Sequence, residues 1–130
     1  MPLAPDFLSD TAAIVIGKTL DATAARQKSI ANNIANVETP GYKRSYVSFE
    51  EELRSVLSRK DRREIQKALS ELVPVRRNDV FSPARPDGNN VNIDAEIADL
   101  AKTGLKHRAA AVLLEGKIAM LRAAITEGKR

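Results

Sequence analysis

Residues 31 to 44, ANNIANVETPGYKR, decide the fold, because a long helical pattern stops there in one abrupt turn. Asn36 tolerates the left-handed conformation with which helices often end. Pro40 restricts Thr39 to extended geometry, so the helix cannot continue through it. Pro40 and Gly41 then fit the second and third positions of a type II turn. The sequence therefore predicts a helix that ends near residue 36 and a chain that leaves it in a fixed direction.

An apolar heptad repeat precedes this turn. From Ala13 to Val37, apolar residues recur at alternating spacings of three and four, which is typical of a left-handed coiled-coil contact. Ser9 or Asp10 is suited to cap the start of the helix by accepting hydrogen bonds from unpaired backbone N–H groups. Thr23 and Gln27 interrupt the apolar pattern near its centre. The expected core positions of this helix are Ile16, Leu20, Ile30, Ile34 and Val37.

A second heptad pattern fills the C-terminal part of the chain. We expect its helix to begin near Asn92 or Asp94, which are good capping residues. At ~1.5 Å per residue the two helices would be roughly 40 and 50 Å long. Antiparallel pairing of the two apolar seams is the simplest way to bury both, so the sequence predicts a mainly α protein with an antiparallel coiled-coil core. The expected core positions of the last helix are Ile97, Leu100, Leu114, Ile118, Leu121 and Ile125.

The last helix is also apolar on the side that faces away from this seam. A two-helix hairpin would leave that side exposed, and a helix that is apolar nearly all round is normally buried all round. Either neighbouring subunits cover it, or the middle of the chain folds back over it. We favour a subunit interface, because exposed apolar patches usually mark interaction sites. Its expected residues are Leu105, Val112, Leu113, Gly116, Ala119, Met120 and Ala123.

The middle of the chain is expected to be a variable segment of short helices and loops. Ser48 to Glu51 and Asp61 to Glu64 both have the spacing of a capping box, which predicts two short helices. Prolines and Gly88 make residues 73 to 90 a loop, with an extended start. The expected units are residues 1–43 for the N-terminal helix and turn, 44–91 for the middle segment, and 92–130 for the C-terminal core helix.

Composition narrows the classes of function. Among 130 residues only 4% are aromatic and none is Trp, which favours a thin, helix-rich protein over one with a wide core. The net charge is +4, but the basic residues are mixed with 17 acidic ones, unlike the concentrated patch of a nucleic-acid-binding protein. The apolar run from Thr11 to Ile16 is far shorter than the ~20 residues of a membrane span. The N-terminus lacks the features of a cleaved secretory signal.

No set of residues predicts catalysis, a cofactor or a metal site. The chain has no Cys and one histidine, His107, so a transition-metal site lacks donors. His107 lies on the second seam, where we expect a packed, hydrogen-bonded side chain. Gly17, Lys18 and Thr19 imitate the end of a phosphate-binding loop, but Ala12 replaces the glycine that such a loop requires. We therefore expect no enzyme activity, and no catalytic, cofactor-binding or metal-binding residues.

The helix end and the turn after it closely resemble the N-terminal signature of bacterial flagellar rod and hook proteins. The resemblance rests on Leu20-Asp21, on IANNIAN over residues 30 to 36, and on TPGYK over residues 39 to 43. The short length and the stretch that begins NNVNIDAEIADL are similar to a proximal rod protein of the FlgB type. The SRAYQAN-like ending of the sister FlgC type is absent. The family turn motif falls here on Asn32, Asn33, Asn36, Thr39, Pro40, Gly41 and Tyr42.

The resemblance implies a non-enzymatic structural subunit of the flagellar basal body, in the proximal rod that crosses the periplasm and transmits motor torque. It implies a core of paired terminal helices that stacks helically, and export through the flagellar type III apparatus without a cleaved signal peptide. The implied partners are other rod proteins and the FliE-like adapter at the rod base, with no nucleic acid and no direct membrane insertion. Two alternatives remain: a soluble coiled-coil adapter or binding module, and another short rod protein of the same family.

The asparagines of the turn motif need an explanation of their own. Asn36 suits a helix end, but Asn32 and Asn33 are poor helix formers. We expect them to form hydrogen bonds with neighbouring chain segments at the corner where the helix ends.

Overall fold

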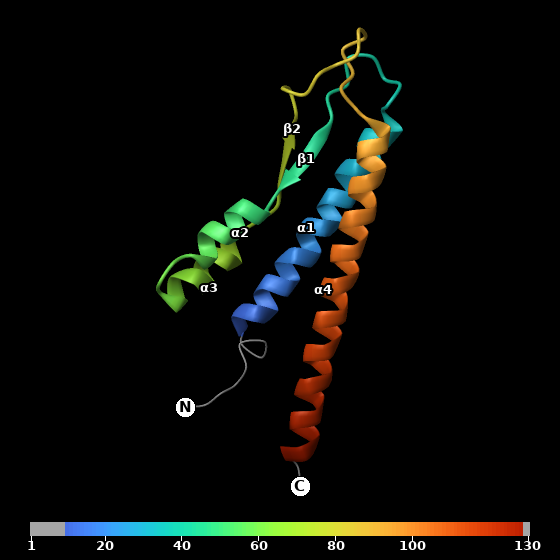
Figure 1. Ribbon diagram of the computed structural model, residues 1–130. Helices are drawn as coiled ribbons and strands as arrows, with labels where there is room; N and C mark the ends of the chain where they lie inside the picture. The colour runs from blue at the N-terminus through green and yellow to red at the C-terminus, as the bar shows by residue number, and fades with distance from the viewer. Residues whose placement is uncertain (1–9, 129–130) are drawn as a thin grey trace.

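Two long antiparallel helices dominate the computed structural model, which describes residues 10–128 (Figure 1). The prediction of a mainly α protein with paired terminal helices is confirmed. Ser9, one of the two suggested caps of the first helix, lies outside the described residues. The elements in chain order are α1 (Asp10–Ala35), β1 (Ser45–Ser48), α2 (Glu50–Leu57), α3 (Arg62–Glu71), β2 (Val75–Asn78) and α4 (Ile93–Gly128).

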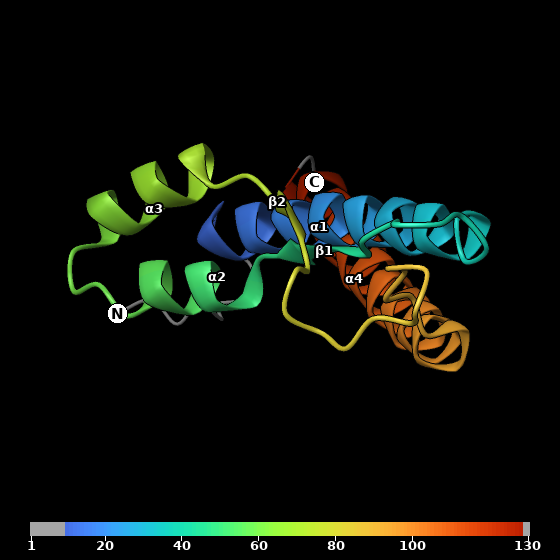
Figure 2. The same ribbon diagram turned by 90° about the horizontal axis from the view of Figure 1, so that it is seen from above.

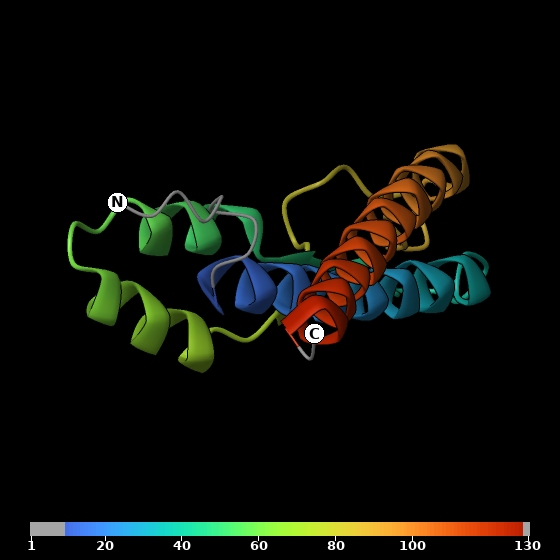
Figure 3. The same ribbon diagram turned by 90° about the horizontal axis from the view of Figure 1, so that it is seen from below.

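The helices α1 and α4 cross obliquely, as the views from the two ends show (Figures 2 and 3). With 26 and 36 residues they differ in length by 10, and the C-terminal turns of α4 extend past the start of α1 (Figure 1). Ile16 and Ile30, two of the expected core positions, are buried, whereas Leu20, Ile34 and Val37 are half-buried. Within residues 10–128 no helix combines the length and apolar character that a membrane span requires.

The face that α4 turns toward the rest of the chain differs from the expected seam. The buried residues of α4 are Glu96, Thr103, Ala110 and Lys117, which recur every seven residues as a heptad contact should. In the single chain the large aliphatic residues of the expected seam stay between 38% and 62% exposed, except Leu114, which is half-buried. A helix that is apolar nearly all round shows its period clearly but does not show which stripe faces the partner helix. The exposed seam residues are Ile97, Leu100, Ile118, Leu121 and Ile125.

Polar contacts hold the middle of the α1–α4 pair. The hydroxyl of Thr23 lies 2.7 Å from Nδ1 of His107 and is also within hydrogen-bond distance of the carbonyl oxygen of Thr19, at 2.9 Å. Thr23 is buried and His107 is half-buried. The histidine is therefore packed and hydrogen-bonded on the helix contact, as its place in the sequence predicts.

A short antiparallel ribbon joins β1 to β2, with Ser45 opposite Asn78 and Ser48 opposite Val75. The sequence predicts extended chain only at the start of the 73–90 loop, so this ribbon is a correction. In β1, Ser45 and Val47 are buried, whereas every residue of β2 is exposed. Strands of four residues, one of them without an apolar alternation, lack the period that identifies a strand.

The two short helices lie beside the N-terminal half of α1 (Figures 2 and 3). The carboxylate of Asp61 caps α3 as predicted, by accepting a hydrogen bond from the backbone N–H of Arg63 at 3.0 Å. The cap of α2 differs from the prediction, because its N-cap is Phe49 and Ser48 instead donates to Glu52 Oε1 at 2.6 Å. The buried apolar residues of this part are Val47, Phe49, Val56 and Leu69.

The turn after α1 has the predicted type II geometry. The N–H of Tyr42 donates to the carbonyl of Thr39 at 3.3 Å, and Gly41 in the third position has φ +73°. Gly88, with φ +87°, lies against it: a Cβ added at Gly88 would be 3.3 Å from the Cα of Gly41. The N–H of Gly41 also donates to the carbonyl of Asp87 at 2.8 Å, so this turn is fastened to the loop that precedes α4.

Replacing Gly41 with valine should lower the free energy of unfolding by about 1 to 3 kcal/mol, because a β-branched residue resists a positive φ. Denaturant unfolding of the purified chain measures the change. The control is Gly17→Ala in α1, where an added Cβ meets nothing within 4 Å and should stabilise the helix. If the Gly41→Val chain is as stable as the parent, a β-branched residue is tolerated at position 41 and the expected strain is absent.

Candidate subunit interface and the corner that positions it

The end of α1, the start of β1 and the first turn of α4 meet at a buried polar corner, where Asn33 is 0% exposed. Its Nδ2 donates to the backbone oxygen of Ser45 at 2.8 Å and to Glu96 Oε2 at 3.0 Å. Its Oδ1 accepts from the backbone N–H of Ser45 at 2.9 Å. The side-chain amide thus binds one edge of β1 as a neighbouring strand would, and it holds the start of α4 at the same time.

Arg44 extends the corner to the segment after β2. Its Nε donates to Glu96 Oε1 at 2.7 Å, and Nη1 donates to Asp79 Oδ2 at 3.1 Å. The Glu96 side chain is only 1% exposed, and a charge so deeply buried is costly unless it is paired and hydrogen-bonded. Here Asn33 and Arg44 bind its two oxygens. The charged pair therefore fixes where α4 begins relative to the ribbon.

Asn89 closes the corner from the side of the loop before α4. Its Nδ2 lies 2.9, 3.0 and 2.9 Å from the carbonyl oxygens of Asn36, Val37 and Thr39. All three carbonyls belong to the turn that follows α1, so this buried side chain holds that turn in place. Arg85 also donates to the carbonyl of Val37. Because α4 follows this loop directly, these hydrogen bonds hold the turn after α1 to the segment that leads into α4.

Asp79 organises the loop after β2. Its carboxylate accepts hydrogen bonds from the Ser82 hydroxyl at 2.5 Å, from the backbone N–H groups of Phe81 and Ser82 at 3.1 and 3.0 Å, and from Arg44. The bond from the Ser82 hydroxyl is the main reason that the pKa of Asp79 lies well below its ordinary value of 3.8. The carboxylate therefore stays ionised at neutral pH, and it binds both backbone and side-chain donors of the loop.

A second charged pair joins α1 to α2. Both nitrogens at the end of Arg26 donate to the carboxylate of Glu50, each at 2.6 Å, and Nη2 also donates to the carbonyl of Val47 at 3.1 Å. The hydrogen bonds from Arg26 lower the pKa of Glu50 below its ordinary value. Unlike Glu96, the Glu50 side chain is half exposed.

The predicted turn motif contributes unequally to this corner. Of its asparagines, Asn33 reaches the neighbouring segments, whereas Asn36 Nδ2 turns back to the carbonyl of Asn32 at 2.8 Å. Two expectations were wrong: Asn36 is not left-handed, because no non-glycine residue among residues 10–128 has a positive φ, and the Asn32 side chain makes none of the described hydrogen bonds to another segment. The Tyr42 hydroxyl donates to Asn33 Oδ1 at 3.2 Å, and Pro40 is exposed. Sequence reasoning missed the partners that complete the corner. Glu96 is a charged residue at the start of an apolar heptad pattern, whereas nothing in the sequence around Asp79 signals its role. The missed residues are Arg44, Asp79, Asn89, Asn90 and Glu96.

The apolar side of α4 that was predicted to be a subunit interface is exposed in the single chain. Its large residues are between 49% and 69% exposed, and α2 and α3 lie beside α1 without covering them (Figure 3). Because the expected seam is exposed as well, α4 presents apolar residues on more than one side. The large residues of the predicted interface are Leu105, Val112, Leu113 and Met120.

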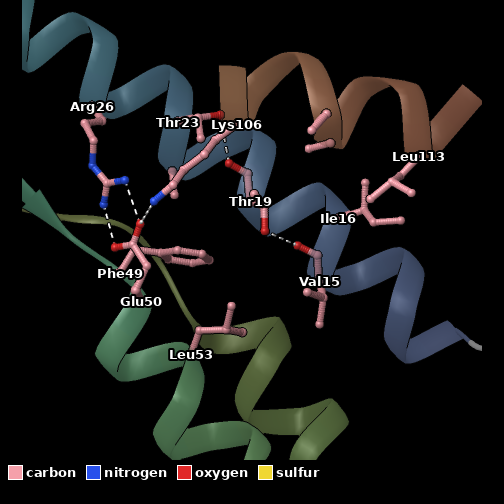
Figure 4. A pocket seen from close by; sticks show the side chains of 13 residues that line it. Val15, Ile16, Thr19, Thr23, Arg26, Phe49, Glu50, Leu53, Lys106 and Leu113 are labelled. Carbon is pink, nitrogen blue, oxygen red and sulfur yellow. Dashed lines mark hydrogen bonds and ion pairs between the residues drawn. The ribbon is translucent and has the colours of Figure 1, made fainter. Parts of the chain in front are cut away.

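An apolar groove of about 380 Å³ continues this surface between α1, α2 and α4 (Figure 4). At one end of it, Lys106 Nζ lies 3.7 Å from Glu50 Oε1. The walls consist mainly of aliphatic side chains and one aromatic ring. The apolar residues that line the groove are Val15, Ile16, Ala22, Phe49, Leu53, Ala109, Ala110 and Leu113.

Among the described residues no group of His, Asp and Glu is placed to hold a metal ion. The charged side chains of the corner bind one another and backbone groups. A family assignment has to account for an elongated helix pair with exposed apolar sides.

Comparison with known proteins identifies that family. Residues 16–43, which cover most of α1 and the turn after it, match the family model described as Flagella basal body rod protein. The chain is similar to FlgB of Borreliella burgdorferi, with 35% identity over 102 residues, or 68% of this chain and 76% of the relative. It is also similar to FlgB of Bacillus subtilis, with 34% identity over 114 residues, or 80% and 84% of the two chains. The chain therefore belongs to the FlgB family of flagellar basal body rod proteins, as a structural subunit of the proximal rod.

Proposed function

We propose that this rod subunit joins its neighbours through the exposed apolar sides of α4. The observation that carries the proposal is the exposure of large aliphatic residues on more than one side of a 36-residue helix. Burying one such side chain fully contributes about 1.5 to 3 kcal/mol. Covering several of them would therefore supply much of the free energy of assembly.

Two different contact surfaces suit a rod. Subunits that stack head to tail by a screw operation form an open filament, and each subunit needs two distinct surfaces for its neighbours. The expected seam, from Ile97 to Ile125, would meet one neighbour, and the side with Val112 and Leu113 would meet another. In this arrangement residues 1–43 and 92–130 form the packed core that carries torque, and residues 44–91 form the outer part.

The partners and the location follow from the same proposal. The family places the protein in the flagellar basal body with other rod components. Within that assembly we infer contacts with other proximal rod proteins and with a FliE-like adapter at the rod base. We also infer a position in the periplasm, reached through the flagellar type III export apparatus without a cleaved signal peptide. Its role there is structural, not enzymatic.

A double replacement, Val112→Asp with Leu113→Asp, should abolish rods and swimming while the protein is still made and exported. Two carboxylates on this side would have to be buried without partners when the neighbour docks, which is prohibitive. Electron microscopy of basal bodies and swimming in soft agar measure the outcome, with export followed by immunoblotting.

The matched control is Val73→Asp, which places the same charge on an exposed valine between α3 and β2. This variant should swim normally. Normal swimming of the α4 double variant would contradict the proposed interface, because side chains buried between subunits cannot both become carboxylates without effect.

A further inference from the structure

The groove between α1, α2 and α4 is an apolar hollow in the surface of the described residues. It measures about 380 Å³, and Val15 of α1 and Leu53 of α2 lie on opposite walls (Figure 4). The ring of Phe49 also lies in the wall. A cavity of about 150 Å³ with such a lining is enough to bind benzene. The groove therefore has room for one aromatic ring and a second apolar side chain.

The groove lies beside the start of the described chain. The structure describes the chain from Asp10, and Val15 and Ile16 are the groove residues nearest to that point. At ~1.5 Å per residue they lie about 7 to 9 Å along α1 from its start. Ala22, farther along the groove, lies about 18 Å from the start. A segment that precedes α1 is therefore joined to it within two helical turns of the groove.

Residues 1–9, MPLAPDFLS, precede α1 and carry large apolar side chains; we call this segment the N-terminal arm. An extended chain advances about 3.3 Å per residue, so Phe7 can reach about 10 Å back along α1 and Leu3 about 23 Å. Folded back along the helix, Phe7 would reach the level of Val15. Leu3 would reach the level of Ala22. Both parts of the groove are thus within reach of the arm.

The link to α1 favours the N-terminal arm over a separate partner. Because the arm is joined to α1 beside the groove, its effective concentration there is on the order of millimolar. A separate partner with the same apolar residues would need that concentration to compete. The composition of the arm also fits, because Phe49 lies in the wall of the groove and one aromatic ring packs favourably against another.

We propose that the N-terminal arm docks in the groove of its own chain, with the ring of Phe7 next to Leu53. Docking joins α2 to the α1–α4 pair through apolar contacts, beside the ion pairs that Glu50 makes at one end of the groove. This contact lies within one subunit and goes beyond the proposed assembly. The described residues that line the groove do not include Val112, so the side of α4 that carries it stays available to a neighbour.

Cysteine cross-linking of the purified full chain tests the contact, since the sequence contains no cysteine. The test chain carries Phe7→Cys with Leu53→Cys, and the control chain carries Phe7→Cys with Val73→Cys. Val73 is 62% exposed and follows Ser70, whose carbonyl accepts a hydrogen bond from Lys18 Nζ at 3.2 Å. A thiol at position 73 is therefore accessible beside the same half of α1. With a short bifunctional thiol reagent, we expect the test chain to cross-link at a yield at least fivefold above the control.

Isotope labelling tells whether the contact lies within one chain. Equal amounts of isotopically labelled and unlabelled test chain are mixed before cross-linking, and the linked peptides are identified by mass spectrometry. We expect pairs of peptides that are both labelled or both unlabelled. Mixed pairs in the proportion of random mixing would show that the arm enters the groove of a second copy, and this would overturn the proposal. A cross-linking yield equal to that of the control would overturn it as well.

Thiol reactivity gives a second readout that needs no cross-link. Leu53→Cys should react with a soluble maleimide at least tenfold faster when Leu3 and Phe7 are both replaced by serine, because the arm then leaves the groove open. Val73→Cys should react at the same rate with either arm. Circular dichroism checks that each chain is helical, and should the Leu53→Cys chain fail to fold, Val15→Cys on the opposite wall takes its place. Equal rates at the groove with the parent arm and the serine arm overturn the proposal.

Discussion

Replacing Asn33 with alanine is expected to lower the free energy of unfolding by about 4 kcal/mol and to prevent rods from forming. The amide binds both backbone groups of Ser45 and one oxygen of Glu96, and all three residues are almost completely buried. Alanine would leave these groups without partners in a space too enclosed for bulk water. Each buried polar group left unpaired costs about 1 to 3 kcal/mol.

The neighbouring asparagine provides a matched control. Asn32 lies on the same turn of α1 and is half-buried, but its side chain makes none of the hydrogen bonds found among residues 10–128. Asn32→Ala should leave stability unchanged or raise it slightly, because alanine is the better helix former. Denaturant unfolding of both variants, with electron microscopy of basal bodies, measures the two effects.

Asn33→Asp separates hydrogen bonding from shape. The carboxylate has the size of the amide but no N–H to donate, so it would face the Glu96 carboxylate and the Ser45 carbonyl with negative charge. This variant should be at least as unstable as Asn33→Ala. Equal stability of the parent and both Asn33 variants would show that the amide bonds do not hold the corner.

The corner gives a physical meaning to the part of the sequence that matches the rod family. Residues 16–43 include Asn33 and the turn, which are one half of the corner. The other half lies outside the match: Arg44 binds Glu96 and Asp79, and Asn89 binds the turn after α1. The matched residues therefore supply some of the hydrogen-bonding groups of the corner, and residues outside the match supply their partners. The corner therefore joins the end of α1, the start of α4 and the loop after β2 to one another.

The features that depend on residues a few positions apart could be predicted from the sequence. The end of α1 near Asn36, the type II turn at Gly41 and the cap of α4 at Asn92 follow from short-range sterics and hydrogen bonding. The pairing of the terminal helices follows from two long heptad patterns. These features depend on residues a few positions apart, and the sequence displays them directly.

Features that depend on distant partners could not be predicted in the same way. Nothing near Glu96 in the sequence indicates that Arg44, 52 residues away, pairs with it. The four residues of β2, VRRN, have no apolar period, and they form a strand because β1 lies alongside. On α4 the apolar period is clear, but more than one side of the helix is apolar, so the period does not show which side packs against α1. The buried side contains Thr103 and Ala110.

Mutation of the buried pair should reveal a strong coupling between Arg44 and Glu96. Arg44→Met should cost about 3 to 5 kcal/mol, because it leaves a carboxylate that is 1% exposed without its cation. Glu96→Met should cost less, because Arg44 keeps Asp79 as a partner and its side chain is 23% exposed. The double variant should be more stable than the sum of the two losses predicts, since no unpaired charge remains buried.

The pair between Arg26 and Glu50 is the control that isolates burial as the cause. Its shortest distance is 2.6 Å against 2.7 Å for Arg44 and Glu96, but the Glu50 side chain is 48% exposed. Water screens such a pair, so the same cycle with Arg26→Met and Glu50→Met should give a coupling of only about 0.5 kcal/mol. Denaturant unfolding of the seven chains, namely the parent, four single variants and two double variants, measures both couplings. Equal couplings would mean that contact distance rather than burial sets the strength of these pairs, and the corner would then be no stiffer than the exposed link between α1 and α2.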